Sequence, residues 1–269
     1  MKTASKIYAA LVFTILYIPI LVLMLFSFNS TANTGALTGL SFYWYKELFN
    51  SPETFNALKN TLVLAISASV ISTVIGTAAA VGMSKFRGNF FKNTLMSVTN
   101  IPMMNPDIVT GISMMLLFVF IGTIAGSEDK LGFSTLLIAH VSFCLPYVIL
   151  SVRPKLLQMN KALPEAAMDL GCTPLQSFFK VELPNIMPGV ISGFILAFTL
   201  SLDDFVISYF TTGNDFQTLP LLIYSMTKKE VKPDIYALST LMILAVTVLL
   251  VLSNISSKGK AAERKAAVK

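Results

Sequence analysis

Three aspartates lie inside long apolar stretches of the sequence, where acidic side chains are unusual. Asp107 follows Pro106, and the adjacent Asp203 and Asp204 interrupt a later apolar run. A charged side chain at membrane depth costs about 3 kcal/mol or more, so such residues usually have a function. Carboxylates that line a path attract cations, which favours a cationic solute. The candidate pathway residues are Asp107, Asp203, Asp204 and, in the same run as the pair, Tyr209.

These acids also have structural explanations. One aspartate of the adjacent pair could cap a broken helix or pair with a basic residue of a partner subunit. Asp107 fits a helix start, because Pro106 before it can begin a helix. The sequence leaves both explanations open for each acid.

The residues give less support to catalysis, metal binding or redox chemistry. The one histidine, His140, lies inside an apolar run. No H-E-x-x-H motif is present and no acid is close to His140 in the sequence, so a packing or hydrogen-bonding role is favoured over catalysis by an intramembrane enzyme. Cys144 and Cys172 are far apart and match no metal or redox spacing. We therefore predict no catalytic residue, no metal site and no cofactor held by this chain.

The composition is that of a membrane protein. Hydrophobic residues make up 54% of the 269 residues and charged residues only 13%, with a mean hydropathy of +0.71. Soluble domains average about 25% charged residues. The net charge of +6 does not indicate nucleic acid, because the basic residues fall between apolar runs, as they do in cytoplasmic loops.

Six apolar runs are long enough to cross a bilayer, which takes about 20 residues per helix. Together they predict an all-α polytopic protein with a single membrane domain over residues 1–269. The predicted spans are 7–28, 58–83, 98–124, 133–152, 186–210 and 235–255.

The distribution of basic residues predicts the orientation. Lys and Arg are more numerous in the loops on the side of the two termini, which places both termini in the cytoplasm. The loop 154–184 is then cytoplasmic, and the basic tail 256–269 is expected to contact anionic lipid. On the other side, the aromatic segment 41–46 is expected to anchor in the membrane interface rather than to bind a partner, and 219–226 to form a short helix.

The loop between the fourth and fifth spans has the pattern of a short surface helix. Pro164 and Glu165 fit a helix start, where proline is tolerated and an acid suits the helix dipole. Ala166 and Ala167 are good helix formers whose small side chains let a partner approach closely. Gly171 is placed to end the helix.

A second short helix is predicted after this glycine. Pro174 can begin it, and Phe178 and Phe179 are expected to be exposed toward a partner or the membrane. Leu183 and Pro184 are expected to break this helix before the fifth span begins. The loop is therefore predicted to form a helix–turn–helix across the cytoplasmic mouth.

The spacing of this loop resembles the EAA loop of ABC-importer permeases, whose pattern is E-A-A-x3-G-x9-I-x-L-P. Every position matches except that Val181 replaces the usual isoleucine. The resemblance implies the MetI-like, type I importer fold and a helix that docks on a cytoplasmic ATPase. The coupling residues that it implies are Glu165, Ala166, Ala167, Asp169, Gly171, Leu183 and Pro184. The chain has no G-x-x-x-x-G-K-[ST] motif, so ATP and Mg are expected on the partner ATPase.

Four further stretches resemble the second permease subunit of spermidine/putrescine importers. They are Ile101–Val109, Phe143–Val148, Leu200–Asp204 and Leu219–Met226. The resemblance implies import of polyamines by alternating access in a bacterial plasma membrane. The partners that it implies are a second permease subunit, two ATPase subunits and an extracytoplasmic substrate-binding protein.

Two alternatives remain open at this point. Related permeases for iron, thiamine, opines or other small solutes share parts of the same stretches. A secondary transporter or channel is the other class, since Asp203 and Asp204 could relay protons. That class has no need of an EAA loop in the cytoplasm.

Overall fold

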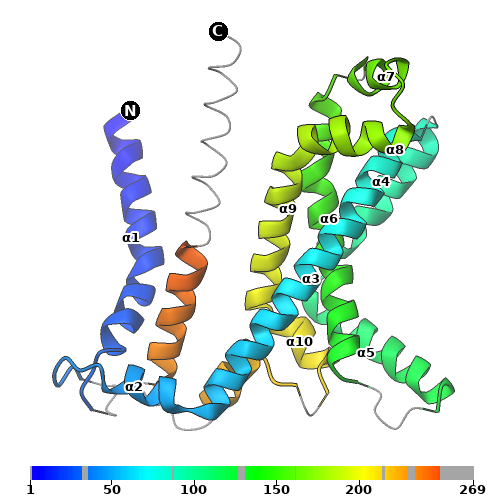
Figure 1. Cartoon of the computed structure of the whole chain (residues 1–269). Coiled ribbons are helices and arrows are strands. Elements are labelled where there is room, and N and C mark those ends of the chain that lie inside the picture. The colour runs from blue at the N-terminus through cyan, green and yellow to red at the C-terminus, as the bar shows by residue number, and fades with distance from the viewer. Residues whose placement is uncertain are drawn as a thin grey trace. The chain divides into compact units, whose positions relative to one another are not determined.

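The computed structural model describes residues 2–31, 36–86, 88–126, 131–160, 162–213, 216–228 and 234–248. Within these ranges the chain is helical and forms no strand, only an isolated bridge between Asn29 and Leu40. The predicted all-α class is therefore confirmed. The described helices group into two compact units, one formed by residues up to Leu58 and by 219–248, the other by Lys59 to Thr218 (Figure 1). The single permease domain stays a prediction, and each unit is described by itself.

The first unit is small and has its own apolar core. The short helix predicted near residue 219 is present as α11 (Leu219–Thr227), and it contributes Leu219 and Leu222 to this core. The other helices of the unit are α1 (Lys2–Phe26), α2 (Tyr43–Asn50), the first turns of α3 (Pro52–Lys85) and the helix Asp234–Val248. The buried core residues are Leu48, Ala57, Leu219, Leu222 and Leu238.

The aromatic segment expected at the membrane interface lies at the start of α2. The Trp44 indole Nε1–H donates to the backbone oxygen of Asn29 at 2.8 Å, which fixes the segment to the residues that follow α1. The Phe28 ring lies 5.3 Å from Phe42 and 5.2 Å from Tyr45, between ring centroids. Anchoring of this aromatic group in the membrane interface stays a prediction.

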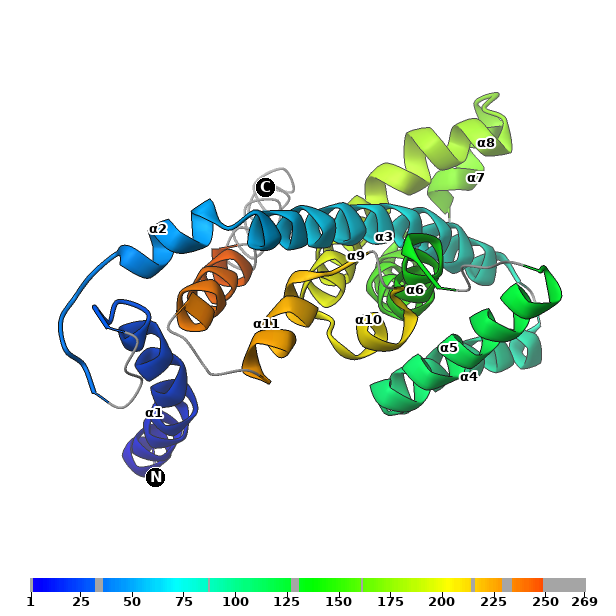
Figure 2. The ribbon, with the colours of Figure 1, turned by 90° about the horizontal axis from the view of Figure 1, so that it is seen from below.

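The second unit contains most of the described helices, the predicted coupling loop and the candidate pathway acids. Its core lies between α3, α6 (Phe133–Gln158) and α9 (Leu183–Asp203), and Figure 2 shows α6, α9 and α10 grouped beside α3. The other helices are α4 (Asn89–Met104), α5 (Asp107–Ile124), α7 (Ala162–Asp169), α8 (Pro174–Ser177), the π-helical turn η1 (Phe178–Glu182) and α10 (Val206–Thr211).

Five helical stretches are long and apolar enough to cross a membrane. These are Lys6–Phe26, Pro52–Lys85, Asp107–Ile124, Phe133–Gln158 and Pro174–Asp203. The sixth predicted span is represented by the shorter apolar helix Asp234–Val248, and its remaining residues lie outside the described ranges, as does the basic tail.

Two predicted spans are interrupted rather than continuous. In the predicted span 98–124, α4 ends at Met104 and α5 begins at Asp107. Asn105 is extended, with ψ of 141°, as expected before proline, and Pro106 has no N–H to continue the ladder. The predicted span 186–210 is interrupted at Asp204, whose backbone is extended, with ψ of 124°.

The break expected at Leu183 and Pro184 is absent. Helical structure continues from α8 through η1 into α9, so that 174–203 is one stretch. A proline lacks the N–H of an ordinary helical turn and clashes with the turn before it. The wider π-helical turn immediately before Pro184, in which the Leu183 N–H bonds the Phe178 oxygen, accommodates it.

The α6–α9 pair packs closely through glycines on α9. A Cβ on Gly189 would lie 2.9 Å from the Ser151 carbonyl oxygen and 3.2 Å from the Val152 Cα. A Cβ on Gly193 would lie 3.3 Å from the Val148 Cα. Small residues of this kind let membrane helices approach closely, which gives extensive backbone packing.

This packing predicts that Gly189→Ala destabilises the second unit. The Lys155 side chain, 2.8 Å from such a Cβ, could move, but the Ser151 and Val152 atoms belong to the α6 backbone and could not, so we expect a loss of about 1–3 kcal/mol. Gly82→Ala in α3 is the matched control, because a Cβ there meets nothing within 4 Å. The apparent melting temperature of the purified protein should fall for Gly189→Ala alone, and an equal fall in both variants would contradict the packing described.

Candidate functional site

The predicted coupling loop forms a helix–turn–helix at one end of the second unit, where α7 and α8 lie together (Figure 1). The turn between them depends on Gly171, whose φ is +90°. The Gly171 N–H bonds the Met168 oxygen at 2.9 Å, and the Cys172 N–H bonds the Ala167 oxygen at 3.0 Å. These bonds satisfy carbonyls at the end of α7, in a backbone conformation that only glycine adopts readily.

The second arm of the loop is capped and held to the first. The Thr173 hydroxyl accepts a hydrogen bond from the Gln176 N–H at 3.3 Å, and the Gln176 side chain accepts one from the Thr173 N–H at 3.0 Å. The Ser177 hydroxyl donates to the Pro164 oxygen at 3.1 Å, which links α8 to α7. The loop is therefore one compact structure.

The coupling residues named from the sequence divide by exposure. Ala167 is buried and Leu183 is partly buried, so these two pack within the unit. Leu163, Leu170 and Leu175 are exposed on the same loop. The exposed coupling candidates are Glu165, Ala166, Asp169, Gly171 and Pro184.

The expected exposure of Phe178 and Phe179 is confirmed for one of the two. Phe179 is 57% exposed, as expected. Phe178 instead packs against the core of the second unit. Because η1 is continuous with α9, the Phe178 ring extends the buried face of that helix toward the loop.

An ion pair joins this loop to α3. The Lys85 Nζ lies 3.2 Å from Glu182 Oε1, and the Glu182 side chain is buried while that of Lys85 is largely exposed. Lys85 ends α3 and Glu182 ends η1, so the pair ties the π-helical turn to a helix distant in sequence. Glu182 was not singled out in the sequence, because nothing local marks it as different from other loop acids.

The two interruptions of the predicted spans lie next to each other. A Cβ on Gly111 of α5 would meet Phe210 Cδ2 at 2.9 Å and the Val206 oxygen at 3.5 Å, which places the first turns of α5 against α10. Asp107 starts α5 one turn before this contact. The fold thus brings Asp107 close to Asp204, although a long stretch of sequence separates them.

The adjacent acids Asp203 and Asp204 differ in their surroundings. Asp203 is exposed, as are Asp107 and Tyr209 nearby. The Asp204 side chain is only 7% exposed and accepts hydrogen bonds from the Ile207 N–H at 3.3 Å and the Ser208 N–H at 2.8 Å. These bonds cap the start of α10, which is the structural alternative considered for one acid of the pair.

His140 completes a buried polar cluster at this break. Its Nδ1 lies 2.8 Å from the Ser201 hydroxyl and its Nε2 3.0 Å from the Ser208 hydroxyl. The same Nε2 lies 3.4 Å from Asp204 Oδ2. Asp204 is therefore close to His140 in space. The sequence could not indicate this contact, because Asp204 lies outside the helix that carries His140.

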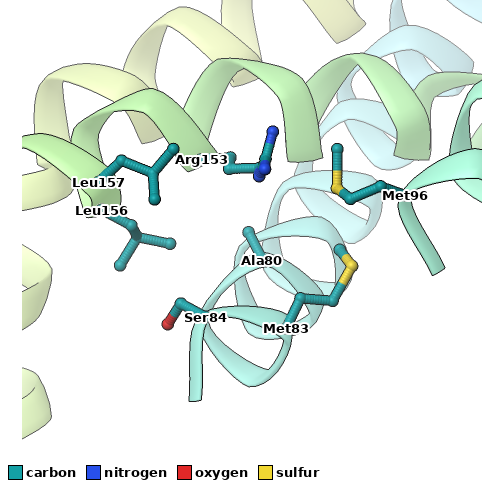
Figure 3. A pocket seen from close by; sticks show the side chains of 7 residues that line it. All are labelled: Ala80, Met83, Ser84, Met96, Arg153, Leu156 and Leu157. Carbon is teal, nitrogen blue, oxygen red and sulfur yellow. The ribbon is translucent and has the colours of Figure 1, made fainter. Parts of the chain in front are cut away.

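A small pocket lies elsewhere in the second unit, between α3, α4 and α6 (Figure 3). Figure 3 shows Arg153 together with mostly apolar side chains around it. The guanidinium gives the pocket a positive charge, and none of the candidate pathway acids lines it. The pocket residues are Ala80, Met83, Ser84, Met96, Arg153, Leu156 and Leu157.

Comparison with known proteins assigns the family. Residues 72–259 match the model of the binding-protein-dependent transport system inner membrane component. The chain belongs to this family. The match includes both the coupling loop and the helix breaks, and together with the apolar helices it makes this a multi-pass membrane protein.

Similar proteins in bacteria are polyamine permeases. The putrescine transport permease PotI of Escherichia coli K12 is 41% identical over 87% of this chain and 83% of its own length. The spermidine/putrescine permease PotC of Haemophilus influenzae is 39% identical over 92% and 93%, and PotC of Escherichia coli K12 is 37% identical over 93% and 92%. The resemblance to the spermidine/putrescine type is thereby confirmed.

Solved structures confirm the permease fold. A chain of a bacterial ABC transporter that imports alginate has a TM-score of 0.69 and 17% identity, with 96% of each chain covered. A chain of the MetNI methionine ABC transporter has a TM-score of 0.62 and 17% identity, covering 78% of this chain and 98% of that one. At these identities the likeness concerns the fold alone.

The loop geometry predicts that Gly171→Ala loosens the end of α7. A side chain at positive φ costs about 1–2 kcal/mol, so the bonds made by the Gly171 and Cys172 amides should open more often. Gly88→Ala is the matched control, since its φ is −85° and a Cβ there meets nothing within 4 Å. Hydrogen exchange should quicken across 166–173 for Gly171→Ala only, and unchanged exchange in that segment would contradict the role of the glycine.

Proposed function

We propose that this chain is a permease subunit of an ATP-driven importer of polyamines such as spermidine and putrescine. The observation that carries the proposal is the 41% identity to a putrescine permease, spread over 87% of the chain. Identity at this level along most of the chain supports a related solute as well as a common fold. The chain would form part of the solute pathway by alternating access.

The charge at the helix breaks supports a cationic solute. The starts of helices carry a partial positive charge, which would repel a polycation. Asp107 occupies the first turn of α5, and Asp204 caps α10, so both helix starts bear a carboxylate. Asp203, which is exposed, adds a further carboxylate at the same break as Asp204.

The coupling loop supports a partner that supplies the energy. Its exposed apolar residues, with Glu165 and Ala166 between them, form a surface that a cytoplasmic ATPase can bind. The chain itself would be non-catalytic, with ATP and Mg bound by two ATPase subunits. A second permease subunit would complete the pathway, and an extracytoplasmic binding protein would deliver the solute.

The position of basic residues supports the proposed orientation, with both termini in the cytoplasm of a bacterial cell. Lys85 ends α3, Arg153 and Lys155 lie in the last turns of α6, and Lys180 lies in η1. These helix ends lie near α7, at one end of the second unit (Figure 1). An excess of Lys and Arg marks the cytoplasmic side of a membrane protein, so the coupling loop would face the ATPase.

Glu165→Arg tests the coupling surface. Reversal of an exposed charge in the first turn of α7 should weaken docking of the ATPase, while the fold of this chain is kept. The measurement is the amount of ATPase that co-purifies with the tagged permease. Glu47→Arg, at an exposed position of α2, is the matched control and should retain the ATPase. Equal retention by both variants would contradict the docking role.

Asp107→Asn and Asp203→Asn test the solute pathway. Loss of a carboxylate that contacts an ammonium group should reduce uptake about tenfold. The measurement is uptake of labelled spermidine and putrescine by the assembled complex, with Glu53→Gln, an exposed acid at the start of α3, as the control. Normal uptake in the double variant Asp107→Asn with Asp203→Asn would remove both residues from the pathway.

A further inference from the structure

We propose that His140 is a positioning residue that holds Asp204 on the start of α10, so that Asp204 fixes the helix break and leaves Asp203 to face the solute. The part of this inference that concerns solute rests on the proposed function. The contact between His140 and Asp204 stands on the geometry of the buried cluster alone.

We assign the proton of His140 to Nε2 on the basis of the groups that surround the ring. An ionised carboxylate only accepts hydrogen bonds, so the Nε2 that lies 3.4 Å from Asp204 Oδ2 carries the proton. The same Nε2–H is directed at the Ser208 hydroxyl oxygen, which accepts it across 3.0 Å between Nε2 and Oγ. Nδ1 is then the acceptor for the Ser201 hydroxyl at 2.8 Å. Both ring nitrogens therefore have partners.

The cluster joins three helices at the break. His140 belongs to α6, Ser201 to the last turn of α9 and Ser208 to α10. The backbone N–H of Ser208 donates to the same Asp204 oxygen that His140 Nε2 approaches, at 2.8 Å. Because His140 and Ser208 are fully buried, these bonds are shielded from water and hold the geometry firmly.

The positions of the two acids follow from this arrangement. Asp204 is directed into the cluster, and its side chain is 7% exposed. Asp203, the last residue of α9, is exposed beside it. A shift of Asp204 off the α10 start would move Asp203 with it, so His140 acts on the exposed acid through its neighbour.

Two substitutions at His140 separate the proposed contact from general packing. In His140→Gln the side-chain amide can place an N–H where Nε2 was, whereas in His140→Asn the shorter amide reaches only the position of Nδ1. Both variants remove the ring. We expect His140→Gln to keep most of the thermal stability and uptake of the assembled complex, and His140→Asn to lower the apparent melting temperature by several degrees and uptake about tenfold.

A double-mutant cycle identifies the partner of His140. The melting temperatures of His140→Asn, Asp204→Asn and the double variant should be non-additive, because both single changes remove the same contact. Asp203→Asn is the matched control, and its effect should add to that of His140→Asn with little change in melting temperature of its own. Additive effects for His140 and Asp204, or equal losses in His140→Gln and His140→Asn, would overturn the proposal.

The stability measurements do not depend on which solute is carried. If polyamines are not the solute, the assembled complex will take up neither spermidine nor putrescine, while the coupling between His140 and Asp204 persists. If that coupling is absent while Asp203→Asn abolishes uptake, the positioning role fails and the proposed function survives.

Discussion

Polar groups inside an apolar helix need partners, and this constraint shapes the second unit. In lipid there is no water to bond a backbone group freed by a broken helix. At Asp204 the break is stabilised by the side chain itself, which accepts from the Ile207 and Ser208 amides. His140 lies against the same carboxylate from α6. A charge that would be costly alone is thereby integrated into the fold.

Helices α6 and α9 join the helix break at Asp204 to the coupling loop. α9 begins directly after η1, where Glu182 is tied to Lys85, and it ends at Asp203. It packs closely on α6 through Gly189 and Gly193, where an added Cβ would lie within 3.3 Å of the α6 backbone. A rigid helix pair therefore connects the surface proposed to dock an ATPase with the acids proposed to face the solute.

Sequence reasoning succeeded where the signal is local. Glycine at position 171, with helix formers before it, predicted the turn that the structure contains at φ of +90°. The long apolar runs predicted helices long enough to cross a membrane. Each of these features depends on residues that are neighbours in the chain.

Sequence reasoning missed the contacts between distant residues and some local departures from a continuous helix. The partners of His140 lie 61 and 68 residues away, so only the fold brings them together. The predicted spans were continued across Asn105 and Asp204 because the apolar runs resume beyond them, although a helix start at Asp107 and a helix cap at one of the paired acids were open alternatives. Pro184 was expected to end a helix that the π-helical turn carries past it. The different roles of Asp203 and Asp204 follow from the directions of their side chains, one exposed and one buried, which composition cannot specify.

The most direct test of the central claim is uptake of labelled spermidine and putrescine into vesicles that contain this chain with its partner permease, ATPase and binding protein. ATP-driven import of polyamines predicts accumulation that requires both ATP hydrolysis and the binding protein, and that excess unlabelled polyamine abolishes. Accumulation that persists without ATP, or none of either polyamine while another solute is transported, would contradict it.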